Sequence, residues 1–431
     1  MKVGVISLGC AKNQVDTERM LGLLRRFGYA FTPDPAAAEV LIVNTCGFID
    51  PAKEESINTI LEMAQYKERG RCRVLVATGC LTERYRQELT AELPEIDILL
   101  GVREYEKLPA LLAQKLNRPL PKLGCALTDR LLTTPPYRAF LRTGDGCNNR
   151  CTYCAIPLIR GNLCSEPVEV LLDEARRLAD GGVSELTVIA QDTSGYGVDR
   201  YGRSMLIPLL RELNRIDGLH WVRVLYTYPD TVSEALLDTL AEGEKLIPYL
   251  DIPLQHIDDD ILRRMHRRGS GAYIRSLLDY LYRNYPDFTL RTTMMVGFPG
   301  ETEEQFQTLL AFLRDYPFDR VGAFAFSPEE GTKAALMEDQ VPEEVKQSRL
   351  AALMAQQKPI SLQRNRRWVG RETELLIETL TPTQAMGRTP REAPDVDGRV
   401  TIPRKSYHAI GEYEAIRLTQ AGEYDMKGES I

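Results

Sequence analysis

Three closely spaced cysteines limit most strongly what this chain can be. They lie in the segment GDGCNNRCTYCAIPLIRG, where Cys147, Cys151 and Cys154 form a C-x3-C-x2-C run. Thiolates this close in sequence can converge on one metal centre without help from distant segments. Iron–sulfur clusters are held by cysteine thiolates, usually four of them for a four-iron cluster. Because a fourth nearby cysteine is missing, one iron would stay open for another ligand, as a reactive metal site requires.

A zinc site or three unrelated thiols could also explain this run. Zinc sites usually contain recurring C-x2-C pairs and four protein ligands. The segment has one C-x2-C pair and no nearby histidine, and Cys164 lies beyond a proline and a glycine. The spacing therefore favours an iron–sulfur cluster over zinc.

The N-terminal region, residues 1–123, alternates between strand and helix patterns. Strands are expected in KVGVISLG, EVLIVNT, RVLVATG and IDILLG, and helices at residues 15–27, 51–67, 82–93 and 108–116. Short apolar strands that alternate with helices predict a parallel sheet covered on both faces. We expect an α/β domain of the flavodoxin-like or Rossmann-like kind.

Three of these strands end in similar tripeptides, each closed by a cysteine: Leu8-Gly9-Cys10, Asn44-Thr45-Cys46 and Thr78-Gly79-Cys80. The carboxyl ends of parallel strands meet at one edge of a sheet, and ligands bind there. A single cysteine in such a place is often only a small apolar residue. Three in matched positions favour a second metal centre made by Cys10, Cys46 and Cys80. Asn13 and Asp16 follow the first of them and could shape its loop.

A proline-rich linker at residues 117–137 leads into a central region, which we place at residues 133–367. Six further strand–helix units predict a (β/α)6 partial TIM barrel there. Chemistry in such barrels takes place at the carboxyl ends of strands, and the C-x3-C-x2-C loop follows the first strand. Polar residues and glycines at the other strand ends are therefore candidates for cofactor binding, namely Gln191, Asp192, Gln255, Gly297 and Gly300.

Glu301, Thr302 and His256, at the ends of two of these strands, have simpler interpretations. Thr302 followed by Gln305 fits a helix capping box, so Glu301 and Thr302 could serve the next helix instead of a ligand. His256 ends the fourth strand of this region, and we expect it to form hydrogen bonds in the wall of the site.

The last region, residues 368–431, contains short strands broken by glycine and proline, which predict a small β-barrel. Glu392, Asp395 and Asp397 lie in one short turn of this barrel. The whole chain has a net charge of −7. This charge argues against broad RNA or DNA binding and is compatible with a basic protein partner.

The composition fits a soluble globular protein, with 43% hydrophobic residues and no apolar run of membrane-spanning length. The N-terminus lacks the layout of a signal peptide. Nine cysteines is an odd number, and several lie in motifs. Reduced thiols that bind metal in the cytoplasm therefore fit better than disulfides, and no membrane partner is expected.

The C-x3-C-x2-C run, with Tyr153 before its last cysteine, resembles the signature of radical S-adenosylmethionine enzymes. SLGCAKNQVDTE and NTCGFI resemble the N-terminal domain of the methylthiotransferases among them, and residues 368–431 resemble the TRAM domain. The resemblance implies two 4Fe-4S clusters, one held by each cysteine set, and S-adenosylmethionine on the free iron at the catalytic set, Cys147, Cys151 and Cys154. It also places Tyr153 beside the adenine and the strand-end residues around the cofactor.

The resemblance further implies the chemistry. Reductive cleavage of S-adenosylmethionine gives a 5′-deoxyadenosyl radical that removes hydrogen from an unactivated carbon. The cluster at the first three cysteines supplies sulfur, and a second S-adenosylmethionine supplies the methyl group. An electron donor such as flavodoxin or ferredoxin is implied as a partner.

The segments APDVDGRV, SPEEGT and QDTSGYG resemble the branch that modifies a ribosomal protein. Its implied substrate is an aspartate of small-subunit ribosomal protein twelve, modified at the β-carbon. One alternative is a tRNA methylthiotransferase that acts on a modified adenosine. TRAM domains of that branch bind RNA, but the acidic turn disfavours RNA contact here. A more distant alternative is a non-catalytic iron–sulfur carrier.

Overall fold

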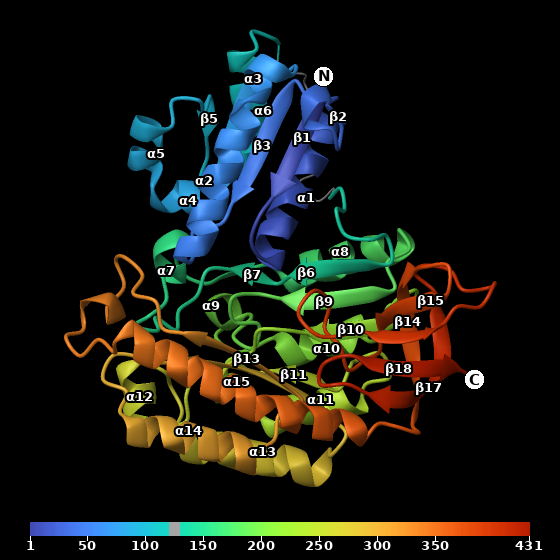
Figure 1. Ribbon diagram of the computed structural model, residues 1–431. Coiled ribbons are helices and arrows are strands. Elements are labelled where there is room, and N and C mark those ends of the chain that lie inside the picture. The colour runs from blue at the N-terminus through green and yellow to red at the C-terminus, as the bar shows by residue number, and fades with distance from the viewer. Residues whose placement is uncertain (120–129) are drawn as a thin grey trace.

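A five-stranded parallel sheet forms the N-terminal part of the computed structural model, which describes residues 1–119 and 130–431 (Figure 1). The strands are β1 (Lys2–Ser7), β2 (Ala30–Phe31), β3 (Val40–Thr45), β4 (Val74–Gly79) and β5 (Ile98–Leu99), in the order β2-β1-β3-β4-β5. All pairings between them are parallel. This order is that of flavodoxin-like sheets, so the predicted fold class is confirmed.

The helices of this domain are α1 (Ala11–Arg26), α2 (Asp50–Ala64), α3 (Tyr66–Arg69), α4 (Cys80–Arg84), α5 (Arg86–Glu92) and α6 (Leu108–Lys115). The helix expected at residues 82–93 is broken at Tyr85, whose φ of −125° and ψ of 39° end α4. The first helix begins four residues earlier than expected, directly after Cys10. Part of the predicted linker, with Cys125, lies outside the described residues.

Six parallel strands form the central domain and follow each other in sequence order. They are β6 (Arg138–Arg142), β9 (Glu185–Ile189), β10 (Trp221–Val224), β11 (Tyr249–Asp251), β12 (Thr289–Val296) and β13 (Arg320–Ala325). They pair as two three-stranded sheets, β10-β9-β6 and β11-β12-β13, which a parallel bridge between Val222 and Leu246 connects. The arrangement confirms the predicted partial barrel, with a narrow break between its third and fourth strands.

Helices cover the outside of this partial barrel and bury a large aliphatic core against the strands. They are α8 (Val168–Asp180), α10 (Leu206–Leu213), α11 (Glu234–Glu242), α12 (Asp259–Arg264), α13 (Gly271–Asn284) and α14 (Glu303–Asp315). Short elements lie on the loops: β7 (Gly144–Asp145), α7 (Ile156–Ile159), β8 (Cys164–Ser165) and α9 (Val198–Tyr201). Among the helices of the described ranges, none has the length and apolar character needed to cross a membrane.

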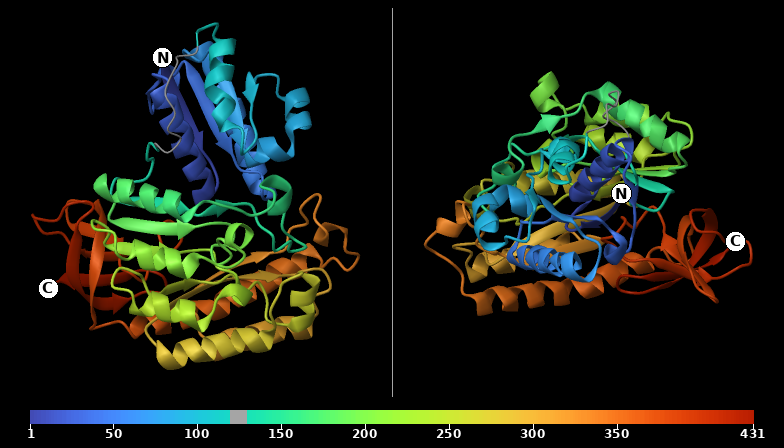
Figure 2. Two further views of the ribbon diagram at one scale, coloured as in Figure 1. Left: turned by 180° about the vertical axis from the view of Figure 1, so that it is seen from behind. Right: turned by 90° about the horizontal axis from the view of Figure 1, so that it is seen from above.

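The C-terminal domain is a closed five-stranded barrel, as predicted. Its strands are β14 (Glu372–Leu380), β15 (Gln384–Arg388), β16 (Val400–Pro403), β17 (Tyr413–Ala421) and β18 (Met426–Ser430), in the order β14-β15-β16-β18-β17. The long helix α15 (Glu343–Arg366) runs along the central domain and ends at the barrel (Figure 1). Figure 2 shows the N-terminal domain stacked on the central domain, with the barrel beside one end of the latter.

The barrel docks against the first residues of the central strands. Arg388 pairs with Glu185 at the start of β9, and Arg320 at the start of β13 pairs with Glu392 at 3.1 Å. Tyr249, the first residue of β11, donates its hydroxyl to Asp397 at 2.6 Å. The barrel therefore closes the amino end of the partial barrel and leaves the carboxyl ends of the strands to the N-terminal domain.

This docking corrects the interpretation of the acidic turn. Glu392 and Asp397 are buried against arginines of the central domain, and Asp395, which pairs with Arg138 at 2.9 Å, keeps an exposed side chain. Two of the three charges are neutralised inside the protein, so they would not repel RNA phosphates. The turn gives no argument against RNA contact, because its acids hold the barrel in place.

Candidate active site

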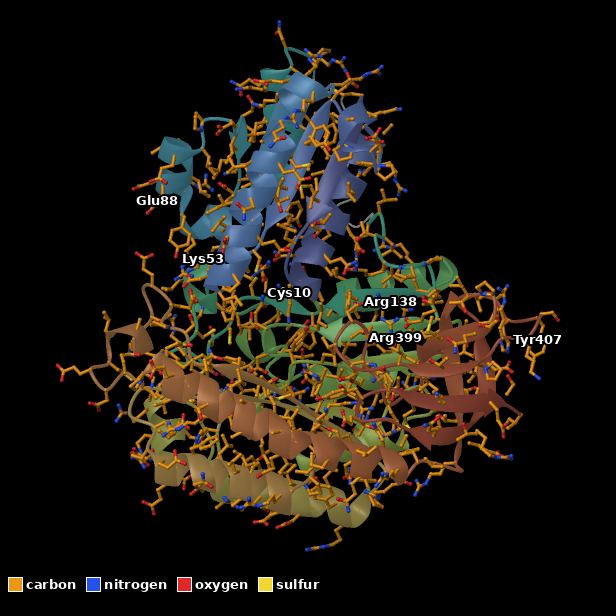
Figure 3. All side chains as sticks on the ribbon, viewed as in Figure 1. Cys10, Lys53, Glu88, Arg138, Arg399 and Tyr407 are labelled. Carbon is orange, nitrogen blue, oxygen red and sulfur yellow. The ribbon has the colours of Figure 1, made fainter. Side chains whose placement is uncertain are left out.

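The first cysteine set lies at the carboxyl edge of the N-terminal sheet. Cys10 follows β1, Cys46 comes directly after β3, and Cys80 begins α4 after β4. In a flavodoxin-like sheet, ligands bind between β1 and β3, where the strand order reverses. Figure 3 shows Cys10 where this edge faces the central domain.

Gly9 allows two of these cysteine loops to approach each other. Its φ of +88° lies in the left-handed region, which residues other than glycine rarely adopt. A Cβ at this position would lie 3.1 Å from the Sγ of Cys46. Glycine is therefore required both by the backbone and by the closeness of the second cysteine.

Asn13, in the first turn of α1, ties the three cysteine loops together. Its Nδ2 donates hydrogen bonds to the backbone oxygens of Leu8 and Thr45, each at 3.0 Å. Its Oδ1 lies 3.5 Å from the Sγ of Cys80. Asn13 therefore contacts all three cysteine loops. From the sequence, we expected it to shape only the loop of Cys10.

The second cysteine set occupies the loop between β7 and α7, after the first strand of the partial barrel. The backbone N–H of Asn149 donates to the Sγ of Cys147 at 3.5 Å. The Sγ of Cys151 lies 3.8 Å from the hydroxyl of Tyr228 and 3.9 Å from a guanidinium nitrogen of Arg267. The third member of the set, Cys154, lines a cavity next to this loop.

One cavity of about 460 Å³ is lined by all six cysteines. Arg160, after the second set, connects the two halves: it donates to the Oδ1 of Asn13 at 2.7 Å and to Asp16 at 2.9 Å, and lies 3.6 Å from the Sγ of Cys80. The structure thus brings both predicted cysteine sets to one enclosed space between the two domains.

Three of the thiols in this cavity lie in an environment that opposes their ionisation. Burial raises the pKa of Cys80 and of Cys154 to about 12, and that of Cys147 to about 11. Thiolates there would need a bound cation to form, and metal binding would release their protons.

The spacing of the ligands bears on the kind of metal centre. No three His, Cys, Asp or Glu side chains within residues 1–119 and 130–431 lie close enough to share a single metal ion. Instead, the thiols are spread around a cavity large enough for a bulkier group. Iron–sulfur clusters, whose cysteines bind separate irons, are groups of this kind.

Three of the predicted cofactor-binding residues line the same cavity: Tyr153, Gln191 and Gln255. The Oε1 atoms of both glutamines are buried and have no hydrogen-bond partner among the described residues. Buried acceptors without partners are rare in proteins, so these two oxygens are available to N–H or O–H groups of a ligand. Gln255 also has a φ of +70°, and strained backbone of this kind concentrates at functional sites.

Asp192, another predicted cofactor-binding residue, is not among the residues that line the cavity. Its carboxylate accepts hydrogen bonds from the Nδ2 of Asn149 at 2.8 Å and the hydroxyl of Ser194 at 2.7 Å. It thereby fixes the loop of the second cysteine set, and direct cofactor contact by Asp192 stays a prediction.

Gly297 and Gly300 are not among the residues that line the cavity. A Cβ at Gly297 would lie 2.3 Å from the Cγ of Lys346, and one at Gly300 would lie 2.5 Å from the guanidinium carbon of Arg264. The close approach that these glycines permit is therefore to the chain's own side chains.

The neighbouring polar residues serve local structure. Thr302 and Gln305 form a complete capping box at the start of α14, which confirms the structural interpretation. The buried carboxylate of Glu301 accepts hydrogen bonds from the backbone N–H groups of Gly297 and Phe298. His256 is fully buried and its Nδ1 accepts from the N–H of Asp258 at 3.0 Å, and a place for it in the wall of the site stays a prediction.

The sequence analysis missed a lysine in the cavity. Lys12 is 7% exposed, and its Nζ lies 3.0 Å from the centre of the Tyr226 ring. Burial lowers the pKa of Lys12 to about 8. Tyr226 has a φ of +63°, and its N–H donates to Asp251 at 2.9 Å, which holds the ring in place. No local motif marks this pair, because its two members come from different domains.

A second cavity, of about 820 Å³, adjoins the first and shares Cys10 and Tyr226 with it. It lies between α1, β6 and the loop of the barrel that carries Asp395 and Val396. All three domains therefore contribute to the approach to the first cysteine set.

Three segments of the chain match known families. Residues 2–101 match Uncharacterized protein family UPF0004, residues 141–313 match the Radical SAM superfamily, and residues 369–431 match the TRAM domain. A Heliobacterium modesticaldum protein named ribosomal protein uS12 methylthiotransferase RimO is 47% identical, covering 100% of this chain and 95% of that protein. A protein of the same name in Geobacter sulfurreducens is 46% identical, covering 100% of this chain and 98% of that protein.

This chain belongs to the RimO family of ribosomal protein uS12 methylthiotransferases. A Clostridium perfringens member is 44% identical and covers 99% of this chain, with 97% of its own length matched. The family and the Radical SAM match show that the chain is a radical S-adenosylmethionine enzyme that uses an iron–sulfur cluster.

Solved structures share the architecture. The radical S-adenosylmethionine methyltransferase TsrM from Kitasatospora setae has a TM-score of 0.56 at 14% identity, covering 75% of this chain and 72% of that chain. The cobalamin-dependent S-adenosylmethionine radical enzyme OxsB has a TM-score of 0.51 at 11% identity, covering 80% of this chain and 56% of that chain. At these identities the similarity shows the fold alone.

Proposed function

We propose that this enzyme transfers a methylthio group to the β-carbon of an aspartate in ribosomal protein uS12, using S-adenosylmethionine and two 4Fe-4S clusters. The observation that carries the proposal is the single cavity lined by two separate cysteine sets. A reaction that removes hydrogen from a carbon and then adds sulfur to it needs both groups within reach of the same atom.

Each cysteine set would hold one cluster. Cys147, Cys151 and Cys154 would hold the cluster whose open iron binds S-adenosylmethionine, and Cys10, Cys46 and Cys80 a second one that carries the sulfur. With the cofactor bound, the first cluster would supply the electron that cleaves S-adenosylmethionine to a radical able to break an unactivated C–H bond, which no side chain can do by acid–base chemistry.

The chain's own residues orient the cofactor and enclose the reaction. We assign Gln191 and Gln255 to polar groups of S-adenosylmethionine, because their buried oxygens are free to accept hydrogen bonds. Tyr153 lines the same wall and is assigned to the adenine. Phe48, Ile49, Ile156 and Ile159 line the cavity with apolar surface, which excludes water from a reactive radical.

A tRNA methylthiotransferase remains the second candidate, because the chain carries a TRAM domain and its acidic turn is largely buried. An iron–sulfur carrier is disfavoured, since it needs no enclosed pocket with free acceptors beside its cluster. We propose a cytoplasmic enzyme that receives electrons from a flavodoxin or ferredoxin.

The test is anaerobic and offers both substrates. The enzyme, with its clusters reconstituted, is given a reductant and S-adenosylmethionine, and then uS12 or bulk tRNA in parallel reactions. Mass spectrometry should find a methylthio group on one aspartate of uS12 and none on tRNA. Modification of tRNA adenosine alone would assign the enzyme to the other branch, and cofactor cleavage without modification of either would leave the substrate assignment without support.

A further inference from the structure

Among the described residues that line the cavity, one cation has no hydrogen-bond acceptor. Four basic residues line it: Lys12, Arg150, Arg160 and Arg267. Arg160 donates to Asp16 and Asp145, Arg150 to the side chain of Asn162 at 2.6 Å, and Arg267 to the hydroxyl of Tyr153 at 3.1 Å. For Lys12, in contrast, the described part of the chain offers only the face of the Tyr226 ring.

Three acids act electrostatically on Lys12, and each is engaged elsewhere: Cys10 belongs to the first cysteine set, and Asp251 and Asp145 are paired with arginines. Asp251 pairs with Arg291 at 2.8 Å, and Asp145 pairs with Arg160 at 2.9 Å. No carboxylate occurs among the described residues that line the cavity. Lys12 is only 7% exposed, and its ammonium group has no hydrogen-bonding partner among the described residues, so a ligand should complete its environment.

The position of Lys12 fits a substrate group rather than a purely structural role. It comes two residues after Cys10, and the ring beneath it, Tyr226, borders both the cysteine cavity and the larger second cavity. A group that enters from the second cavity towards the first cysteine set would pass this lysine. A cation on an aromatic ring is held in place while its remaining N–H groups stay free.

We propose that Lys12 binds the side-chain carboxylate of the substrate aspartate and thereby selects aspartate over neutral side chains. The inference rests on the proposed function, because it takes uS12 as the substrate. In aspartate, the β-carbon is bonded directly to the carboxylate carbon. A hydrogen-bonded ion pair at the carboxylate therefore fixes the reacting carbon within one bond of the anchor.

The test compares uS12 with a form in which the target aspartate is replaced by asparagine, which has the same shape without the charge. Binding of both labelled proteins to the anaerobic, cluster-loaded enzyme is measured by fluorescence anisotropy. We expect the wild-type enzyme to prefer the aspartate form by about tenfold or more, as for hydrogen bonds to charged groups. Lys12→Met should bind the two forms equally, and Lys12→Arg should retain a preference.

Lys53→Met is the matched control, because Lys53 lies near the cavity but pairs with Asp50 at 2.7 Å and Glu329 at 2.9 Å. This variant should prefer the aspartate form of uS12 over the asparagine form by the same factor as the wild-type enzyme. If Lys12→Met does not assemble its clusters, Lys12→Gln, which still donates hydrogen bonds but carries no charge, provides the same comparison.

Three results would overturn the assignment. The first is a wild-type ratio retained in Lys12→Met, and the second is a wild-type enzyme that modifies uS12 but binds both forms equally. The third is a tenfold loss of S-adenosylmethionine affinity in Lys12→Met with the aspartate preference intact, which would place Lys12 on the cofactor. A wild-type enzyme that neither binds nor modifies uS12 would instead refute the proposed function, and Lys12's role with it.

Discussion

Arg160 donates a hydrogen bond to Asn13 at 2.7 Å, and this contact joins the two cysteine sets across the domain boundary. Arg160 follows the second set, directly after α7, whereas Asn13 holds the loops of the first set. The same guanidinium also pairs with Asp16 and Asp145. The distance between the cysteine sets is therefore fixed by a buried ion-pair network rather than by apolar packing alone.

Arg160→Met should loosen this junction. The change removes the ion pairs of Arg160 with Asp16 and Asp145, which costs about 3–5 kcal/mol for a broken buried pair. Hydrogen exchange should rise at the ends of β1, β3 and β4 that face the central domain. Arg215→Met is the control, since Arg215 is 72% exposed and pairs with Glu212 within the central domain. Equal exchange in both variants would show that Arg160 does not hold the domains together.

Asp397→Asn should detach the barrel from the central domain more than Asp395→Asn does. The buried Asp397 accepts from the Tyr249 hydroxyl and lies 3.7 Å from Arg291, whereas the side chain of Asp395 is 57% exposed. We expect a loss of roughly 2–4 kcal/mol of docking free energy for Asp397 and under about 1 kcal/mol for Asp395. Limited proteolysis after residue 367 measures the release. Similar cleavage rates for the two variants would contradict the docking role of the buried acid.

Gly9→Ala should remove iron from the first cysteine set. A methyl group would lie against the Sγ of Cys46, at 3.1 Å, in addition to the strain of a φ of +88°. Gly182→Ala is a matched control, because Gly182 has a φ of +97° with nothing within 4 Å of an added Cβ. With two four-iron clusters, we expect about eight irons per chain to fall towards about four in Gly9→Ala only. A full iron content in Gly9→Ala would show that the loop tolerates the side chain.

The fully buried His256 should make stability depend on pH. Burial lowers its pKa to about 4 from 6.5, so the unfolded chain binds a proton below pH 6.5 while the folded protein does not. The stability that neutral His256 contributes is thus present above pH 6.5 and is lost as the pH falls towards 4, by about 3 kcal/mol at most. His256→Gln should flatten thermal stability across this range. An unchanged slope in His256→Gln would mean that the folded protein protonates this ring.

Local sequence patterns were sufficient for the fold and for both cysteine sets. The alternation of apolar strands with helices placed Cys10, Cys46 and Cys80 at one sheet edge, and the spacing of Cys147, Cys151 and Cys154 identified their loop. These features depend on neighbours within a few residues, so a sequence reveals them.

The contacts that complete the site were not predictable in this way. Arg160 and Asp16 are 144 residues apart, and Arg320 and Glu392 are 72 residues apart. Only the folded chain shows that Arg160 links the cysteine sets and that the acidic turn is buried. For Gly297 and Gly300, cofactor contact stays a prediction, because a glycine at a strand end can serve a nearby side chain as well as a ligand.

The division of labour between the cysteine sets is tested most directly by comparing Cys46→Ala with Cys151→Ala. Both variants are reconstituted anaerobically, and each is assayed for 5′-deoxyadenosine formation and for methylthio transfer to uS12. We predict that Cys46→Ala still forms 5′-deoxyadenosine but transfers no methylthio group, and that Cys151→Ala does neither. Loss of both activities in a folded Cys46→Ala enzyme, with iron retained at the second set, would contradict the account.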